Sequence, residues 1–147
     1  MVCLDASIFL AWLLPEDLSD QADALMARLS HKGERILVPL LVTPEVLSGL
    51  RRAVYRKRVT AEHGESARVL FEKTSVALHD LLGLAESAWA LGKSLNAASL
   101  HDMFYLALAE REECDLWTGD KRLIGLLDSR FPRVKYLGDL SLDDQPA

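Results

Sequence analysis

Residues 2–5 are Val-Cys-Leu-Asp, and residues 6–14 follow without a break as Ala-Ser-Ile-Phe-Leu-Ala-Trp-Leu-Leu, up to Pro15. The first run is short, apolar and ends in an acid, which is typical of a buried strand. The second run is long enough for a helix, which Pro15 ends because proline cannot continue it. A buried strand that passes directly into a helix is the repeating unit of α/β proteins with parallel sheets. These residues therefore predict an α/β fold.

The rest of the chain repeats this alternation of strand and helix. Further strands are predicted at residues 36–38, 75–78, 115–118 and 134–137. Further helices are predicted at residues 18–29, 45–54, 60–73, 83–95, 99–113 and 121–127. Such alternation favours a mostly parallel sheet of about five strands with helices on both faces. We expect residues 1–147 to form a single domain, because this length suits one hydrophobic core.

Two helix ends carry recognisable signals. Thr43-Pro44-Glu45 predicts a helix start, with Thr43 as the N-cap, Pro44 at the first helical position and Glu45 in the first turn. Gly33 predicts the end of the helix that covers residues 18–29, because glycine readily adopts the left-handed conformation that closes helices. Trp89 and Trp117 are expected in the core.

Composition restricts the class of protein. A net charge of −5 argues against a general nucleic-acid coat protein, but not against an enzyme acting on RNA, because a metal site itself requires negative charge. No run of about 18 apolar residues occurs, so we expect no membrane span. Residues 1–5 lack the basic start of a signal peptide. Cys3 and Cys114 fit no zinc pattern and are expected to be reduced, buried thiols in a cytoplasmic protein.

Four acids lie where strands give way to helices or in the first turn of a helix. Asp5 ends the first strand, and Asp120 follows the fourth. Glu45 opens the helix after the second strand, and Asp102 opens the helix before the fourth. Ligands of open α/β sheets bind beyond the carboxyl ends of the strands. We therefore expect these four side chains to meet at one edge of the sheet.

Each acid also has a structural explanation when it is taken singly. Asp5 and Asp120 can cap helices, and Glu45 can complement a helix dipole. Asp102 lies three residues after Ser99, which is the spacing of a capping box. The joint occurrence of four acids at one predicted edge favours a shared site.

Carboxylates packed together repel one another, and a divalent cation relieves that repulsion. Oxygen ligands suit Mg²⁺ or Mn²⁺. Such an ion activates water for in-line hydrolysis of a phosphodiester and requires no protein nucleophile. Ser7 and Thr118 lie two residues from Asp5 and Asp120, so their hydroxyls could orient these carboxylates. Ordinary helix-start and strand-end hydroxyls remain the alternative.

The chain resembles PIN domains, and among them the VapC toxins of toxin–antitoxin pairs. The resemblance is carried by residues 2–9, 12–17, 43–52, 99–110 and 116–123, in this order. It implies a three-layer α/β/α domain, with Asp5, Glu45, Asp102 and Asp120 as catalytic, metal-binding acids and Thr118 as a supporting residue. It further implies an Mg²⁺-dependent endoribonuclease, a small antitoxin that blocks the site, and a homodimer. Two residues depart from the common pattern: Ser48 where many relatives have Asn, and His101 where many have an aromatic residue.

Basic residues near the acids are candidates for contact with RNA. Arg51 and Arg52 follow Glu45 on its helix, and Lys121 and Arg122 follow Asp120. Lys and Arg supply most of the affinity for phosphates. Complementing a helix dipole, solvating the surface and binding an acidic antitoxin remain alternatives. The apolar residues 12–14 are expected in the core, with a groove for an antitoxin helix as the alternative.

Other functions are considered beside the toxin ribonuclease. A PIN-fold protein could bind RNA or protein without cleaving, although the intact set of four acids speaks against it. A DNA-directed or structure-specific nuclease could use the same metal site. A haloacid-dehalogenase-like phosphatase would need a second Asp where this chain has Ser7.

Overall fold

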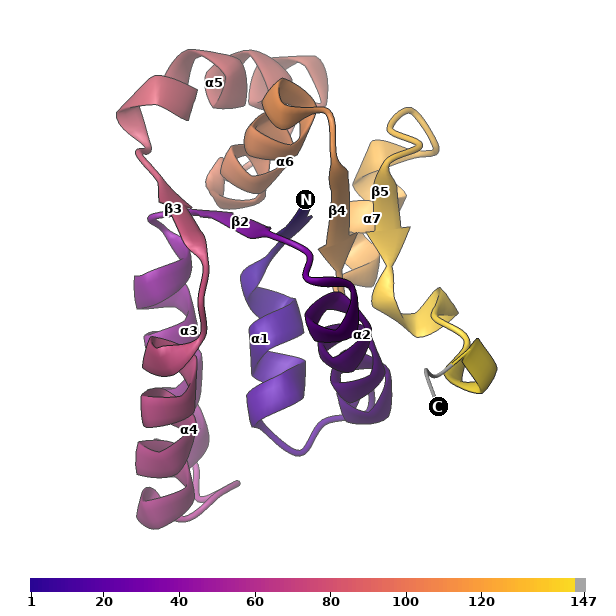
Figure 1. Ribbon diagram of the computed structural model, residues 1–147. Helices are drawn as coiled ribbons and strands as arrows, with labels where there is room; N and C mark the ends of the chain where they lie inside the picture. The colour runs from indigo at the N-terminus through magenta and orange to yellow at the C-terminus, as the bar shows by residue number, and fades with distance from the viewer. Residues whose placement is uncertain (145–147) are drawn as a thin grey trace.

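Five parallel strands form the centre of the protein in a computed structural model that describes residues 1–144 (Figure 1). They are β1 (Val2–Leu4), β2 (Ile36–Pro39), β3 (Ala77–His79), β4 (Asp115–Thr118) and β5 (Val134–Tyr136), in the spatial order β3-β2-β1-β4-β5. All four pairings between neighbouring strands are parallel. This confirms the predicted parallel sheet.

Burial along the strands follows their place in the sheet. Every residue of β1 and β2 is buried, the third interior strand β4 alternates between exposed or half-buried and buried residues, and the edge strands β3 and β5 are half-buried or exposed. Continuous apolar runs are what a sheet covered on both faces requires. The apolar stretch Val2–Leu4 therefore occupies the middle of the sheet, between β2 and β4.

Helices cover both faces of the sheet, as predicted. They are α1 (Ala6–Leu13), α2 (Ser19–Lys32), α3 (Val42–Tyr55), α4 (Ala61–Lys73), α5 (Ala85–Ser94), α6 (His101–Glu112) and α7 (Lys121–Leu127), with short 3₁₀ turns η1 (Leu82–Leu84), η2 (Leu137–Asp139) and η3 (Leu142–Asp144). Figure 1 shows α5 and α6 on one side of the sheet and α1 to α4 on the other. Helix α1 packs against α2, α3 and β4, and α6 packs against α5, β1, β2 and β4. The architecture is thus α/β/α in three layers.

The direction in which successive strands are added to the sheet reverses beside β1. The chain moves from β1 outward to β2 and β3, then crosses back to β4 on the other side of β1, and continues to β5. In open α/β sheets, such a switch point leaves a crevice at the carboxyl ends of the two central strands. The residues that follow β1 and β4 at this crevice are Asp5 and residues 119–120.

The predicted start of α3 is wrong by two residues. Helix α3 begins at Val42, and no side chain caps it. Leu41 already has helical backbone angles, and the amides of Thr43 and Glu45 bond to the carbonyls of Leu40 and Leu41. The turn after β2 therefore enters the helix directly and leaves no position for Thr43 as N-cap. Pro44 stays in the first turn, where its missing N–H costs no helical hydrogen bond.

Two other predicted boundaries differ from the structure by one or two residues. Helix α6 begins at His101 rather than Ser99, and β3 lies at residues 77–79 rather than 75–78. Gly33 closes α2 in a left-handed conformation, as predicted. Trp89 is 69% exposed, against the expectation of a core position, because α5 buries only its narrow face of Ala88 and Gly92.

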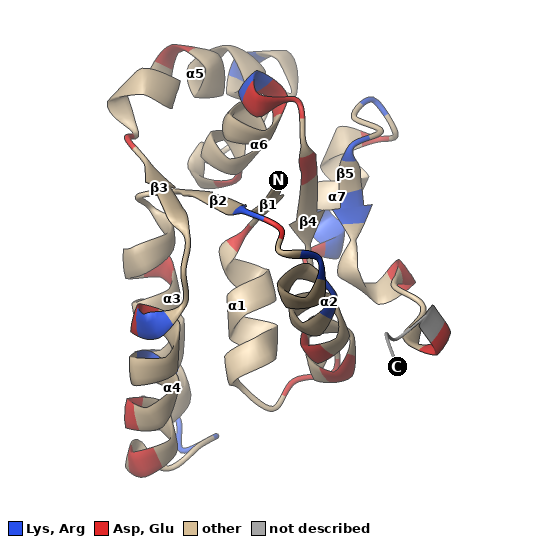
Figure 2. Cartoon of the chain, in the orientation of Figure 1, with Lys and Arg blue, Asp and Glu red and all other residues tan. Residues whose placement is uncertain are grey.

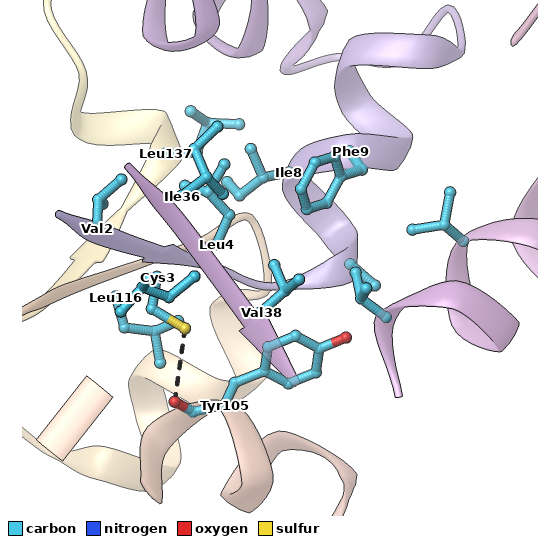
Figure 3. Packing of buried hydrophobic residues seen from close by; sticks show 14 of the residues in the cluster. Val2, Cys3, Leu4, Ile8, Phe9, Ile36, Val38, Tyr105, Leu116 and Leu137 are labelled. Atoms are coloured by element: carbon cyan, nitrogen blue, oxygen red, sulfur yellow. Dashed lines mark hydrogen bonds between the residues drawn. The ribbon is translucent and has the colours of Figure 1, made fainter. Parts of the chain in front are cut away.

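The two cysteines, Cys3 and Cys114, are buried and free, as predicted. The thiol of Cys3 contacts the carbonyl oxygen of Tyr105 at 3.7 Å, from β1 across to α6 (Figure 3). Within residues 1–144, no helix combines the length and the apolar character that a membrane crossing needs.

Candidate active site

One cavity of about 790 Å³ opens beyond the carboxyl ends of the central strands and brings the four predicted acids together. Its lining includes Asp5, Glu45, Asp102 and Asp120. They come from the end of β1, the first turn of α3, the first turn of α6 and the residue before α7. Figure 2 shows the acidic residue at the junction of β1 and α1. Side chains separated by up to 115 positions in sequence therefore share one hollow.

Asp5 is the most buried of these acids, with 4% of its surface exposed. Its carboxylate accepts hydrogen bonds from the amide and the hydroxyl of Ser7, and it caps α1. Burial raises the pKa of Asp5 to about 7, although hydrogen bonds from Ser7 and Thr118 work in the opposite direction. The charge of Asp102 raises this pKa further. A neutral Asp5 is thus readily reached near pH 7 when no cation is present.

Two hydroxyls join the ends of β1 and β4. The Ser7 hydroxyl donates to Asp5 and accepts from the Gly119 amide at 2.8 Å. The Thr118 hydroxyl, fully buried, accepts from the amide of Asp120 at 3.0 Å. A Cβ on Gly119 would lie 3.3 Å from the Ser7 oxygen, so glycine permits this close approach. The predicted supporting hydroxyls therefore hold both loops in register.

Asp120 is held by Arg122. Its carboxylate accepts the Arg122 amide at 2.9 Å, which caps α7, and pairs with the guanidinium at 3.2 Å. Burial works against ionisation of Asp120, but these contacts with Arg122 outweigh it, and the pKa of Asp120 is lowered. Asp120 therefore stays ionised beside its neighbours.

Glu45 and Asp102 are the other two acids of the lining. Burial raises the pKa of both carboxyls. The charge of Asp102 raises the pKa of Glu45 further, and the charge of Asp120 does the same to Asp102. The acids thus interact electrostatically, which is the repulsion that a cation would relieve.

The donor set suits a divalent cation in its chemistry, because carboxylate oxygens are the ligands that hard cations prefer. Within residues 1–144, however, no three His, Cys, Asp or Glu side chains lie close enough to hold one ion. Glu45 is turned to Tyr105, and Asp120 to Arg122. An ion held by three or more of these side chains would therefore need them to approach one another more closely than they do here. Their role as ligands stays a prediction.

A sequence model of the PIN-domain family matches residues 2–134, which is most of the chain and includes all four acids. The chain belongs to the PIN-domain family. The resemblance drawn from the sequence is thereby confirmed, as is the three-layer fold that it implied.

Two relatives indicate the group within the PIN-domain family to which this chain belongs. The VapC ribonuclease Mb0985 of Mycobacterium bovis is 39% identical over 123 residues, which cover 84% of this chain and 88% of that protein. Ribonuclease VapC9 of Mycobacterium tuberculosis matches to the same extent. Within its family, this PIN domain therefore belongs with the VapC ribonucleases.

Solved structures share the fold. A toxin–antitoxin complex from Klebsiella pneumoniae contains a chain with a TM-score of 0.65 and 17% identity, covering 93% of this chain and 98% of that one. VapC20 of Mycobacterium tuberculosis, described as a toxin that cleaves the sarcin–ricin loop, has a TM-score of 0.59 and 18% identity over 85% of this chain and 95% of its own. At such low identity, these likenesses speak for the fold alone.

The four predicted basic residues divide into two pairs in this PIN domain. Arg52 and Arg122 line the cavity. The part of its lining that falls within residues 1–144 includes neither Arg51 nor Lys121. Arg51 is exposed on α3, and the Lys121 ammonium lies 5.8 Å from the centre of the Tyr136 ring. The two departures from the family pattern, Ser48 and His101, both line the cavity.

Sequence reasoning missed Tyr105. This side chain lines the cavity, is 1% exposed, and donates a hydrogen bond from its phenol to Glu45 at 2.9 Å. Burial, and then the charge of Glu45, raise the pKa of Tyr105 well above its usual range, so the phenol remains a donor. The available signal was spacing, because Tyr105 lies three residues after Asp102 and so shares a helix face with it.

Proposed function

We propose that this protein is an Mg²⁺-dependent endoribonuclease that hydrolyses RNA phosphodiesters by metal-activated water. The observation that carries the proposal is the convergence of four carboxylates on one cavity in a chain related to the VapC ribonucleases. PIN-domain ribonucleases in general use divalent metal ions. The choice of Mg²⁺, with Mn²⁺ as substitute, follows from the all-oxygen donor set.

Each part of the cavity has a role in this reaction. Asp5, Glu45, Asp102 and Asp120 are the proposed metal ligands, and the ion that they would hold supplies a low-pKa water and neutralises charge on the phosphodiester. Ser7 and Thr118 keep the ligand loops in place through their hydrogen bonds.

Arg52 and Arg122 are the proposed contacts to the phosphates that flank the cut bond, since guanidinium groups match phosphate geometry. Arg51 and Lys121, outside the lining, are proposed for more distant phosphates. No side-chain nucleophile is needed.

We further propose that the chain is the toxin of a toxin–antitoxin pair. Structural neighbours include the Klebsiella complex, VapBC2 from Rickettsia felis bound to a promoter DNA fragment, and FitAcB from Neisseria gonorrhoeae. The proposed partner is a small antitoxin that covers the cavity, and the proposed assembly is a cytoplasmic homodimer of a single-domain chain of residues 1–147.

The test is cleavage of total RNA by Asp102→Asn with controlled Mg²⁺. We expect loss of cleavage with the fold retained, because the variant loses one ligand charge and keeps its size. Asp20→Asn is a matched control, since Asp20 also lies in the first turn of a helix but is exposed and outside the cavity lining. A fully active Asp102→Asn protein contradicts the proposal. Binding of RNA by the wild type without any cleavage would instead favour a non-cleaving PIN module.

A further inference from the structure

Tyr105 makes one hydrogen bond through its backbone carbonyl and one through its side chain. It lies on α6, the helix that packs against β1, β2 and β4. Its backbone carbonyl accepts from the Cys3 thiol at 3.7 Å, and its phenol donates to Oε1 of Glu45 at 2.9 Å. Figure 3 shows the ring among the buried residues, with the phenol oxygen pointing away from Cys3. The ring therefore spans from the sheet to the cavity.

Glu45 needs such a contact to be held in place. It lies in the first turn of α3, where it is half-buried, and a glutamate side chain loses much rotamer freedom when it is fixed. Tyr105 comes from a different helix, 60 positions further along the chain. A carboxylate has about four lone-pair sites, so one hydrogen bond leaves Oε2 and part of Oε1 for a cation.

We propose that Tyr105 is a positioning residue for Glu45, whose buried phenol holds the carboxylate at the four-acid cavity before a divalent cation binds. This inference rests on the proposed function, because it requires Glu45 to be a metal ligand. Groups that hydrogen-bond a ligand carboxylate orient it, and their loss costs about 10–100-fold in metal affinity or activity. Tyr105 itself touches neither the substrate nor the reacting water in this proposal.

The test measures Mn²⁺ binding to the full chain by isothermal titration calorimetry. Tyr105→Phe removes one oxygen and keeps the buried ring, so we expect Mn²⁺ affinity to fall about 10–100-fold. At saturating Mn²⁺, the kcat for RNA cleavage should return close to the wild-type value, which a loss of structure would not allow. Tyr55→Phe is the matched control, because Tyr55 is 76% exposed at the end of α3 and should bind Mn²⁺ as the wild type does.

A double-mutant cycle separates this inference from the proposed function. If Tyr105 acts through Glu45, adding Tyr105→Phe to Glu45→Ala should weaken Mn²⁺ binding no further. Unchanged Mn²⁺ affinity in folded Tyr105→Phe, or additive losses of Mn²⁺ affinity in the double variant, overturns this inference and leaves the proposed function standing. If Glu45→Ala leaves Mn²⁺ binding unchanged, the proposed ligand set fails and the inference falls with it. Thermal melting of each metal-free variant checks that the fold is retained.

Discussion

Ser7 and Gly119 lie 112 positions apart in the sequence and are joined by a hydrogen bond of 2.8 Å from the Gly119 amide to the Ser7 hydroxyl. The same hydroxyl donates to Asp5. One oxygen atom thus connects the end of β1 to the end of β4 and fixes the most buried acid of the cavity.

Ser7→Ala should therefore reduce both stability and activity. The change leaves the half-buried Gly119 amide and the buried Asp5 carboxylate without this partner, which costs about 1–3 kcal/mol in the free energy of unfolding. RNA cleavage should fall about 10–100-fold because Asp5 is less well oriented. Urea unfolding and cleavage rates measure the two effects. Ser66→Ala, at an exposed position on α4, should change neither.

Replacement by alanine should be harmful at Gly119 and stabilising at Gly125. A Cβ on Gly119 would lie 3.3 Å from the Ser7 oxygen, so Gly119→Ala should displace that oxygen and lower the cleavage rate. A Cβ on Gly125, within α7, would have no atom within 4 Å. Gly125→Ala should raise the free energy of unfolding by about 0.5–1 kcal/mol, because glycine is unfavourable inside a helix. Equal cleavage rates in Gly119→Ala and Gly125→Ala would contradict the close contact at Gly119.

The metal-free protein should lose stability as the pH rises from about 4 to 7. The pKa of Asp5 is about 7 in the folded chain and near 3.8 in the unfolded chain, so the folded state binds more protons between these values. The stabilisation from protonated Asp5 is complete below the unfolded pKa and is lost as the pH passes through the folded one. Its size is on the order of 4 kcal/mol.

Asp5→Asn checks this pH dependence. Urea unfolding at several pH values in a chelator should show a much smaller slope in the variant than in the wild type. Raised pKa values of Glu45 and Asp102 contribute a residual slope of the same sign, and the lowered pKa of Asp120 contributes a slope of the opposite sign. A wild-type stability that rises with pH over this window would show that Asp5 is ionised in the folded chain.

Arg51 and Arg52 provide a matched pair for substrate contact. They are neighbours on α3, but only Arg52 lines the cavity within the described chain. Arg52→Gln should raise the KM for RNA and lower the slope of log affinity against log salt by about 0.7, the value for one phosphate contact on a single strand. Arg51→Gln should have a smaller effect. Equal effects would place the RNA path along the exposed face of α3.

Much of the site could be predicted from the sequence because its acids are tied to local signals. Asp5 and Asp120 follow strands and were open to a capping explanation as well as a metal-site one. The structure confirms that both cap helices, and it also places both at the cavity of the proposed metal site. For Asp102 the predicted capping box is not formed, since the N-cap of α6 is Leu100 and Ser99 accepts the His101 amide, at 3.4 Å.

The remaining features depend on three-dimensional packing. The contact between Tyr105 and Glu45 joins two helices whose proximity no local pattern encodes. Whether Arg51 or Arg52 lines the cavity depends on how α3 is rotated about its axis. The exposure of Trp89 depends on the narrow face that α5 buries. Thr43 was misplaced because the turn after β2 has helical backbone angles of its own.

The pairing of β1 with β4 also bears on how such an enzyme is made. The cavity takes side chains from residue 5 through Leu126, so a growing polypeptide lacks it until the strand at residues 115–118 has left the ribosome and docked beside β1. We therefore expect a nascent chain to lack ribonuclease activity until Asp120 has been made and β4 has docked beside β1. The messenger and ribosome that produce it are exposed to its activity only after synthesis of this late strand.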